Sequence, residues 1–182
     1  SGSVFDGTTT TTFTGERNGY RNVTDPAPQA GRYTILLPGD DQSVATGFPK
    51  GDGWATMVVG RDGTARMVGV LADGRAFSAG LALMRSGEAP VYAALFGGRG
   101  SLAGMLQFIL NPGVSDAGGM IHWNRPRRRT ELYPLGFSID IPIISSAYQR
   151  IEDGRFLPEL DATDGRAAIT FGEGNLSADL TQ

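Results

Sequence analysis

Six Asp-Gly pairs divide this chain into short segments, and they restrict its fold more than any other feature. Asp-Gly is a strong signal for a two-residue hairpin, because a type I′ turn needs positive φ at both central residues. Glycine adopts this conformation freely, and aspartate tolerates it. The sequence therefore predicts structural turns at Asp6-Gly7, Asp52-Gly53, Asp62-Gly63, Asp73-Gly74, Asp153-Gly154 and Asp164-Gly165.

The segments between the turns have the pattern of β-strands. In RYTILL, for example, the spacing of Tyr33, Ile35 and Leu37 places them on one face of a strand. The 27 glycines and 10 prolines lie between such short apolar runs, which favours many strands over helices. Consecutive antiparallel strands are predicted at residues 32–37, 54–59, 65–71, 75–84, 90–96, 101–110 and 118–123, with further strands in RAAITF and NLSADL near the end.

Glycines inside these strands indicate how the sheet is shaped. Gly69, Gly80 and Gly104 fall in strand interiors, where glycine usually marks a bulge, a bend or a close backbone approach. We therefore predict an all-β fold, an antiparallel meander that forms a barrel or a strongly coiled sheet. A two-sheet β-sandwich is the alternative. Residues 125–158 are predicted to form a long irregular excursion with a few extended pieces.

Length and charge limit the classes of function. With 182 residues, 40% of them hydrophobic, we expect one β-barrel-like domain over residues 25–182, preceded by a β-hairpin arm over residues 1–24. A net charge of −3 argues against nucleic acid as a partner. No apolar stretch approaches the roughly 18 residues of a membrane helix, so no membrane insertion is expected, and any export signal lies outside the chain.

The chain lacks the common signatures of metal sites and catalytic sites. It has no cysteine, and no Asp-Gly segment has the spacing of an EF-hand or a calcium β-roll, so we predict no cofactor and no metal. DATDG, at residues 161–165, is the remaining candidate for calcium. His122 is the single histidine, and the sequence contains no G-x-S-x-G motif that would supply a serine nucleophile for it. The acidic residues Glu88, Glu131 and Asp140 follow no pattern typical of a catalytic site. We expect a protein that is not an enzyme; a glycoside hydrolase with paired carboxylates is the alternative.

An arginine cluster beside aromatic residues is the candidate binding site. Arginine next to aromatic rings can hold anionic groups or stack on sugars. We expect Trp123 to be exposed, whereas Trp54 and Tyr92 are expected in the core or at the barrel rim. The alternative function is therefore a binding module for carbohydrates or anionic polymers, and its residues are Trp123, Arg125, Arg127, Arg128, Arg129 and Tyr133. A solvated loop is the simpler interpretation of the cluster.

Residues 25–137 also resemble a known kind of module. The ordered segments are DPAPQAGRYTILLPG, then GVLADG, GSLAGMLQF, GGMIHWNRP and ELYPLGF. This order is similar to a β-rich module that recurs in large multi-domain secreted or cell-surface proteins of bacteria. The resemblance implies β architecture and an extracellular or cell-surface location, and it transfers no activity to any residue.

The function expected from these observations is that of a structural or assembly module. Under the resemblance, the N-terminal hairpin is the end of a preceding unit, and relatives continue beyond GNLSADLTQ with further strands. Strands missing from the chain would leave open edges, which favour pairing with another copy. The threonine run at residues 8–12 suits an exposed edge strand. The other interpretation is a solvated hairpin arm of the same domain.

Overall fold

The computed structural model describes residues 1–39, 47–108, 116–129, 131–148, 170–171 and 180–181. The chain divides into two compact units, Ser1–Tyr148 and Gln149–Gln182. In the second unit, β11 (Thr170–Phe171) pairs with β12 (Leu180–Thr181). The described residues contain no helix, and hence no helix that is long and apolar enough to cross a membrane.

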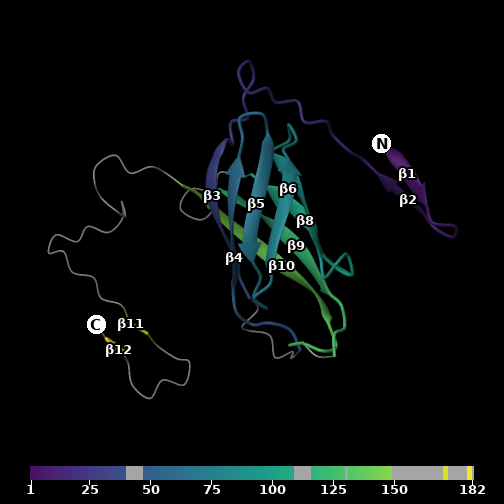
Figure 1. The fold of residues 1–182 in the computed structure, drawn as a ribbon. Coiled ribbons are helices and arrows are strands. Elements are labelled where there is room, and N and C mark those ends of the chain that lie inside the picture. The colour runs from purple at the N-terminus through teal and green to yellow at the C-terminus, as the bar shows by residue number, and fades with distance from the viewer. Residues whose placement is uncertain (40–46, 109–115, 130, 149–169, 172–179, 182) are drawn as a thin grey trace. The chain divides into compact units, whose positions relative to one another are not determined.

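The first unit contains a hairpin and an eight-stranded antiparallel sheet (Figure 1). The hairpin pairs β1 (Gly2–Phe5) with β2 (Thr10–Phe13). The predicted strands over residues 32–123 are confirmed, with boundaries that differ by a few residues. The large sheet consists of β3 (Gly31–Leu37), β4 (Gly53–Val59), β5 (Thr64–Val70), β6 (Ala76–Ala82), β7 (Glu88–Leu95), β8 (Gly100–Gln107), β9 (Ala117–Arg125) and β10 (Phe137–Ala147).

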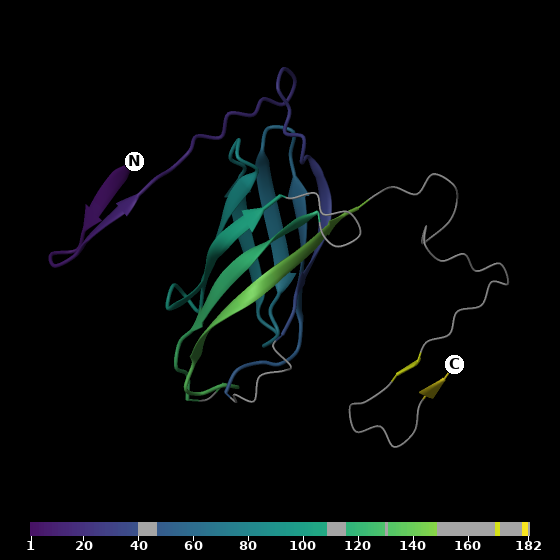
Figure 2. The same ribbon diagram turned by 180° about the vertical axis from the view of Figure 1, so that it is seen from behind.

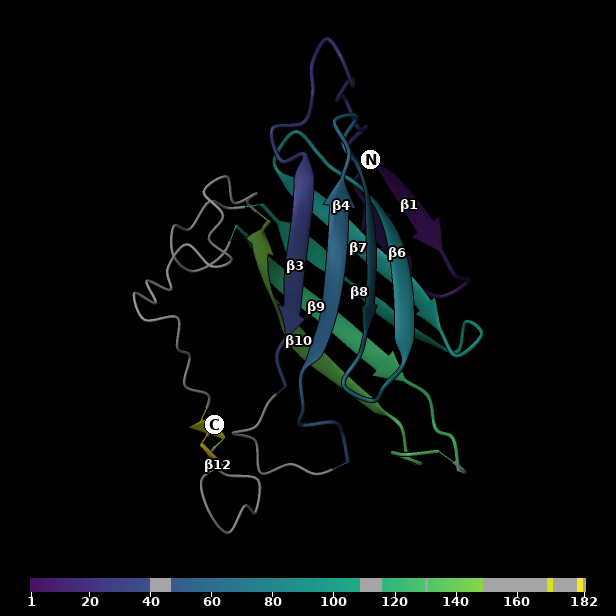
Figure 3. The same cartoon turned by 60° about the vertical axis from the view of Figure 1, so that its left-hand side comes forward.

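The eight strands coil into a nearly closed barrel, as the sequence predicts. Their order is β6-β5-β4-β3-β10-β9-β8-β7, so the first and last strands of the meander, β3 and β10, pair with each other. β6 and β7 lie close together without a hydrogen-bonded ladder. Figures 2 and 3 show the wall formed by β3 to β6 crossing the wall formed by β8 to β10 at an angle.

The two-residue turns predicted at Asp62-Gly63 and Asp73-Gly74 are three-residue loops instead, and a third hairpin of the barrel has the same kind of loop. In each, three residues connect a hydrogen-bonded pair, as in the bond from Gly60 N–H to Thr64 O of 2.7 Å. Only the glycine has positive φ, and no described aspartate does, so these are not type I′ turns. A type I turn followed by a left-handed glycine fits these values. The loops are Arg61–Gly63, Ala72–Gly74 and Arg85–Gly87, with glycine φ values of 76°, 81° and 84°.

Asp62 shows why aspartate is favoured before these glycines. Its carboxylate accepts hydrogen bonds from the hydroxyl and the N–H of Thr64, at 2.8 and 3.0 Å. The bond from the Thr64 hydroxyl is the main reason that the pKa of Asp62 lies below its usual value. The carboxylate therefore closes its own turn, and aspartate does not need positive φ.

The other Asp-Gly pairs differ among themselves. Asp6-Gly7 forms the turn between β1 and β2, with Gly7 at a φ of 99°. The turn predicted at Asp52-Gly53 is wrong: Gly53 begins β4, and the Asp52 carboxylate accepts a hydrogen bond of 2.9 Å from the N–H of Gly39. Asp153-Gly154, Asp164-Gly165 and the DATDG segment lie outside the described residues.

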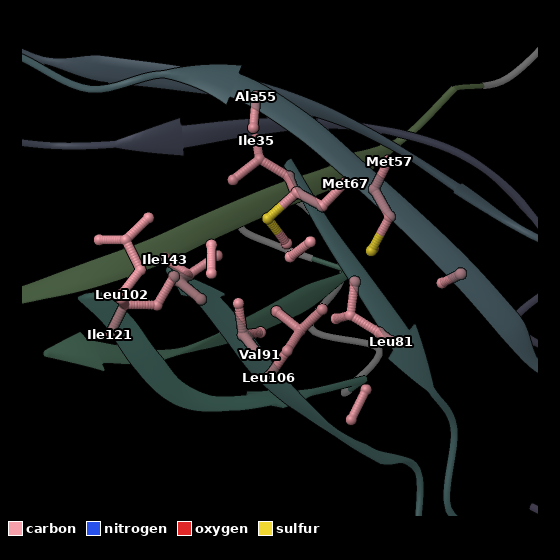
Figure 4. Close-up of a cluster of buried hydrophobic side chains, with 14 of the residues drawn as sticks. Ile35, Ala55, Met57, Met67, Leu81, Val91, Leu102, Leu106, Ile121 and Ile143 are labelled. Carbon is pink, nitrogen blue, oxygen red and sulfur yellow. The ribbon is translucent and has the colours of Figure 1, made fainter. Parts of the chain in front are cut away.

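The barrel interior is filled by side chains from both walls (Figure 4). Successive residues of a strand point to opposite faces, so every second residue enters the core. β4 and β5 show this, because Ala55, Met57 and Met67 are at most 1% exposed while their neighbours along the strand face solvent. Leu102 and Ile121 fill the space from the opposite wall.

β10 corrects the prediction of an irregular excursion. The strand is 11 residues long, the longest described, and Ile141 and Ile143 alternate into the core. The period-two pattern of this strand is present in the sequence, although proline, which cannot donate to a ladder, is uncommon inside a strand. Proline is compatible here because its nitrogen faces the side of β10 on which pairing has ended.

Substituting the strand glycines tests the packing of the barrel wall. An added Cβ at Gly69 would lie 2.2 Å from the Trp54 carbonyl oxygen and 2.6 Å from the Ala55 Cβ. We expect Gly69→Ala to lower the free energy of unfolding by about 1–3 kcal/mol, measured by urea denaturation. The control is Gly80→Ala, which meets nothing within 4 Å and should leave stability unchanged or slightly raised. Equal effects of the two variants would contradict this account.

Candidate functional site

Trp123, predicted to be exposed, is instead buried in the core. It is 1% exposed and packs edge-on against Phe137, with ring centroids 4.7 Å apart. Its neighbours in sequence, His122 and Asn124, are polar, but in a strand adjacent residues point to opposite faces. His122 therefore faces outward and Trp123 inward. Trp54 and Tyr92, expected in the core or at the rim, are 55% and 63% exposed.

Arg125 is also buried, and it forms an internal ion-pair network. Its Nε lies 3.1 Å from Asp73 Oδ2, and both side chains are only 3% exposed. The other guanidinium nitrogens donate to the Tyr133 carbonyl oxygen at 2.8 Å and to Glu131 at 3.1 Å. Asp73 thus both forms a turn and balances a buried charge, which is a structural role for both residues.

The remaining residues of the predicted binding surface lie apart from Trp123. Arg128 pairs with Glu131 at 3.0 Å. Arg127 and Arg129 are exposed and line a hollow with Pro134 and Leu135. The structure therefore does not bring the tryptophan and the four arginines together on one surface.

The outer face of β9 and β10 carries a group of three side chains that the sequence analysis did not connect. His122 Nδ1 lies 2.7 Å from Asp140 Oδ1, and His122 Nε2 lies 2.7 Å from Ser138 Oγ. An ionised carboxylate can only accept, so Nδ1 carries the proton and donates to Asp140. In the neutral ring, Nε2 is then the acceptor for the Ser138 hydroxyl. This is the order of bonds found in a Ser-His-Asp triad.

Strand geometry explains why these residues meet. His122 lies directly opposite Asp140 in the β9–β10 register, and Ser138 lies two residues before Asp140 on the same face. The imidazole reaches both β10 side chains from the neighbouring strand. The only signal in the sequence was the alternation S-I-D in residues 138–140, which becomes informative only when the register with β9 is known.

One edge of β10 is open beside this group. The ladder between β3 and β10 covers Ile144 to Ala147. If the register continued by two more residues, Pro142 would lie opposite Pro38. Neither proline has an N–H, so the ladder ends. The hydrogen bond from Tyr148 N–H to Arg32 O shows that the main-chain N–H and C=O groups of even-numbered residues of β10 point toward β3. The main-chain groups of Ser138 and Asp140 thus face a side where no described strand pairs with them.

A pocket occupies the gap where β3 and β10 separate. It has a volume of about 470 Å³, and its lining is mostly apolar, with Leu37, Pro38, Phe48, Ile139 and Pro142 among the lining residues. Asp140 and Trp123 also line it. The buried indole Nε1 of Trp123 has no hydrogen-bond partner within the described part of the chain. An unpaired buried donor is uncommon in proteins. The pocket itself is a candidate site because it is mostly apolar and lies beside the open edge of β10.

Metal binding finds no support in the described ranges, where no group of three or more His, Asp and Glu side chains could hold an ion.

Comparison with known proteins adds no function: no protein-family model, curated protein or solved structure matches the chain. The resemblance to a module of bacterial surface proteins therefore remains a prediction.

The Arg125–Asp73 pair gives a test of the buried network. Asp73→Asn keeps the shape of the side chain but leaves the Arg125 charge without its closest buried partner. We expect the free energy of unfolding to fall by about 3–5 kcal/mol in denaturant titrations. Asp25→Asn, which removes an exposed partner of Arg85, is the matched control and should change stability little. A loss as small as that of the control would contradict the structural role assigned to Arg125.

Proposed function

We propose that this protein is a structural module that assembles through open β-edges, with the β1–β2 hairpin of one copy pairing with the open edge of β10 in another. The observation that carries the proposal is the main-chain edge at Ser138–Pro142, which ends at the opposed prolines and borders an apolar pocket. An extended segment added to such an edge gains main-chain hydrogen bonds, and adjacent pockets receive its side chains.

The hairpin has the properties of the inserted segment. Each of its strands is four residues long, and no other described strand pairs with either. A single two-stranded hairpin is marginally stable in water. Val4, Phe5 and Phe13 are 59%, 66% and 55% exposed, so pairing with another copy would bury apolar surface that the hairpin leaves in solvent.

The length and chemistry of the two surfaces agree. The open edge spans five residues, Ser138 to Pro142, and the hairpin strands span four. An apolar residue of an added strand can enter the pocket beside Ile139 and Pro142. The threonines at residues 8–12 are β-branched and polar, which suits a strand that is exposed before assembly.

A secreted or cell-surface bacterial protein is the setting that we propose for this module, and it rests on the resemblance of residues 25–137 alone. The carbohydrate-binding alternative loses support, because Trp123 is buried and Arg125 is engaged internally. Arg127, Arg129 and the partly exposed Tyr133 would have to carry such binding without them.

Light scattering of the purified chain across a range of concentrations tests this function. We expect the molar mass to rise with concentration above the 19.2 kDa of one chain. Phe5→Lys with Phe13→Lys should abolish the rise, because charges on the added strand would be buried in the pocket or at the edge. Both side chains are exposed, so the barrel should keep its unfolding temperature.

A second variant tests the edge itself. Asp140→Pro removes a main-chain N–H that makes no intramolecular ladder bond, and it should reduce assembly at least as much as the hairpin variant does. Asp140→Asn retains the N–H and serves as the matched control, with assembly unchanged. A chain that is monomeric at every concentration, or assembly that survives Asp140→Pro, would show that this proposal is wrong.

A further inference from the structure

We propose that Ser138, His122 and Asp140 form a serine-nucleophile site that cleaves carboxylic esters with apolar acyl groups. This inference does not require self-association, although it uses the same open edge of β10, and it departs from the expectation of a protein without catalysis. That expectation depended on the missing G-x-S-x-G motif, but a triad is defined by geometry and not by sequence order.

The three side chains satisfy the first requirement, which is a continuous chain of hydrogen bonds. Both contacts of the imidazole are 2.7 Å long, one from each ring nitrogen. Asp140 fixes the tautomer in which Nε2 is free of a proton, and the Ser138 hydroxyl donates to that nitrogen. His122 can therefore act as the base that removes the hydroxyl proton.

The open edge of β10 supplies the second requirement, a donor for the oxyanion. The main-chain N–H groups of Ser138 and Asp140 lie on the side of β10 that no described strand covers. Residues two apart on a strand lie about 6.6 Å apart, too far for both N–H groups to reach one oxygen, so we assign the Ser138 N–H as the donor. Elsewhere in the sheet interior, such N–H groups are consumed by ladders and cannot stabilise developing charge.

The substrate class follows from what surrounds the group. Asp140 belongs to the triad and also lines the apolar pocket, so the pocket lies at the same edge of β10 as the triad. Its volume of about 470 Å³ suits an aliphatic or aromatic acyl group. The side chains of His122 and Asp140 are 51% and 65% exposed, so water can reach an acyl-enzyme and hydrolyse it.

The reaction balances without any cofactor. Ser138 Oγ forms a bond to the acyl carbon as His122 Nε2 takes the hydroxyl proton, and the resulting oxyanion collapses to break the bond to the leaving alkoxide. His122 returns the proton to that alkoxide. A water molecule then attacks the acyl carbon with His122 again as base, which releases the carboxylic acid and restores the serine.

A fluorophosphonate probe tests the nucleophile directly. The serine oxygen would bond to phosphorus, fluoride would leave, and the proton would pass to His122. We expect mass spectrometry of the dilute chain to find the label on Ser138, with none there in Ser138→Ala and at least about tenfold slower labelling in His122→Ala and Asp140→Asn. Ser78→Ala, at another exposed strand serine, should label as the unaltered chain does.

Hydrolysis of p-nitrophenyl butyrate gives a second readout. We expect the unaltered chain to exceed Ser138→Ala by about 10²-fold, the lower end of what a positioned base contributes. All three side chains are exposed, so the variants should unfold at the same temperature as the unaltered chain. Label spread evenly over exposed serines, labelling that persists after denaturation, or equal rates for Ser138→Ala and the unaltered chain would overturn the proposal.

Discussion

The alternation of side chains across a nearly closed barrel wall decides almost every assignment in this protein. In a barrel wall, the side chain of each strand residue points either into the packed interior or out to solvent, because no second sheet covers the outer face. On β9 this sends Trp123 and Arg125 inward and His122 outward. The hydrophobic interior is therefore continuous, and the polar groups available for chemistry are those on the outer face or at places where the wall opens.

The same alternation buries the charged side chain of Arg125, which costs desolvation free energy. A guanidinium that enters the barrel must be compensated, and the turn residue Asp73 does this from the opposite wall with help from Glu131. The Phe96 ring packs against the guanidinium groups of Arg75 and Arg125. Its centroid lies 3.9 Å from the guanidinium carbon of Arg75 and 5.2 Å from that of Arg125. Charge and aromatic contacts thus close one part of the barrel, and the arginine-rich segment is in large part structural.

The wall opens where β3 and β10 separate. The Pro38 and Pro142 positions end their ladder without leaving an unpaired N–H at that point, which is a local and inexpensive way to interrupt a sheet. Beyond it, β10 continues as an edge, with a pocket on one side and the Ser138, His122 and Asp140 side chains on its outer face. Both the proposed assembly and the proposed ester cleavage depend on this interruption.

Much of the fold could be predicted from the sequence, because turns and alternation are local signals. Asp62-Gly63 and Asp73-Gly74 turn the chain, and the strands from β3 to β9 follow the apolar pattern. The candidate site could not be predicted, because it depends on register. Nothing local indicates that His122 lies opposite Asp140, or that Pro142 lies at an open edge. Trp123 was misjudged because neighbours in sequence were taken to share its environment, whereas in a strand they lie on the other face.

Residue-resolved amide hydrogen exchange in the dilute monomer tests the open edge of β10 most directly. If the account is right, the N–H groups of Ser138 and Asp140 exchange quickly, while those of Ile139, Ile141 and Ile143, which face β9, are protected. Uniform protection from 138 to 143 would contradict it, because the edge would then be paired and unavailable both to an added strand and to an oxyanion.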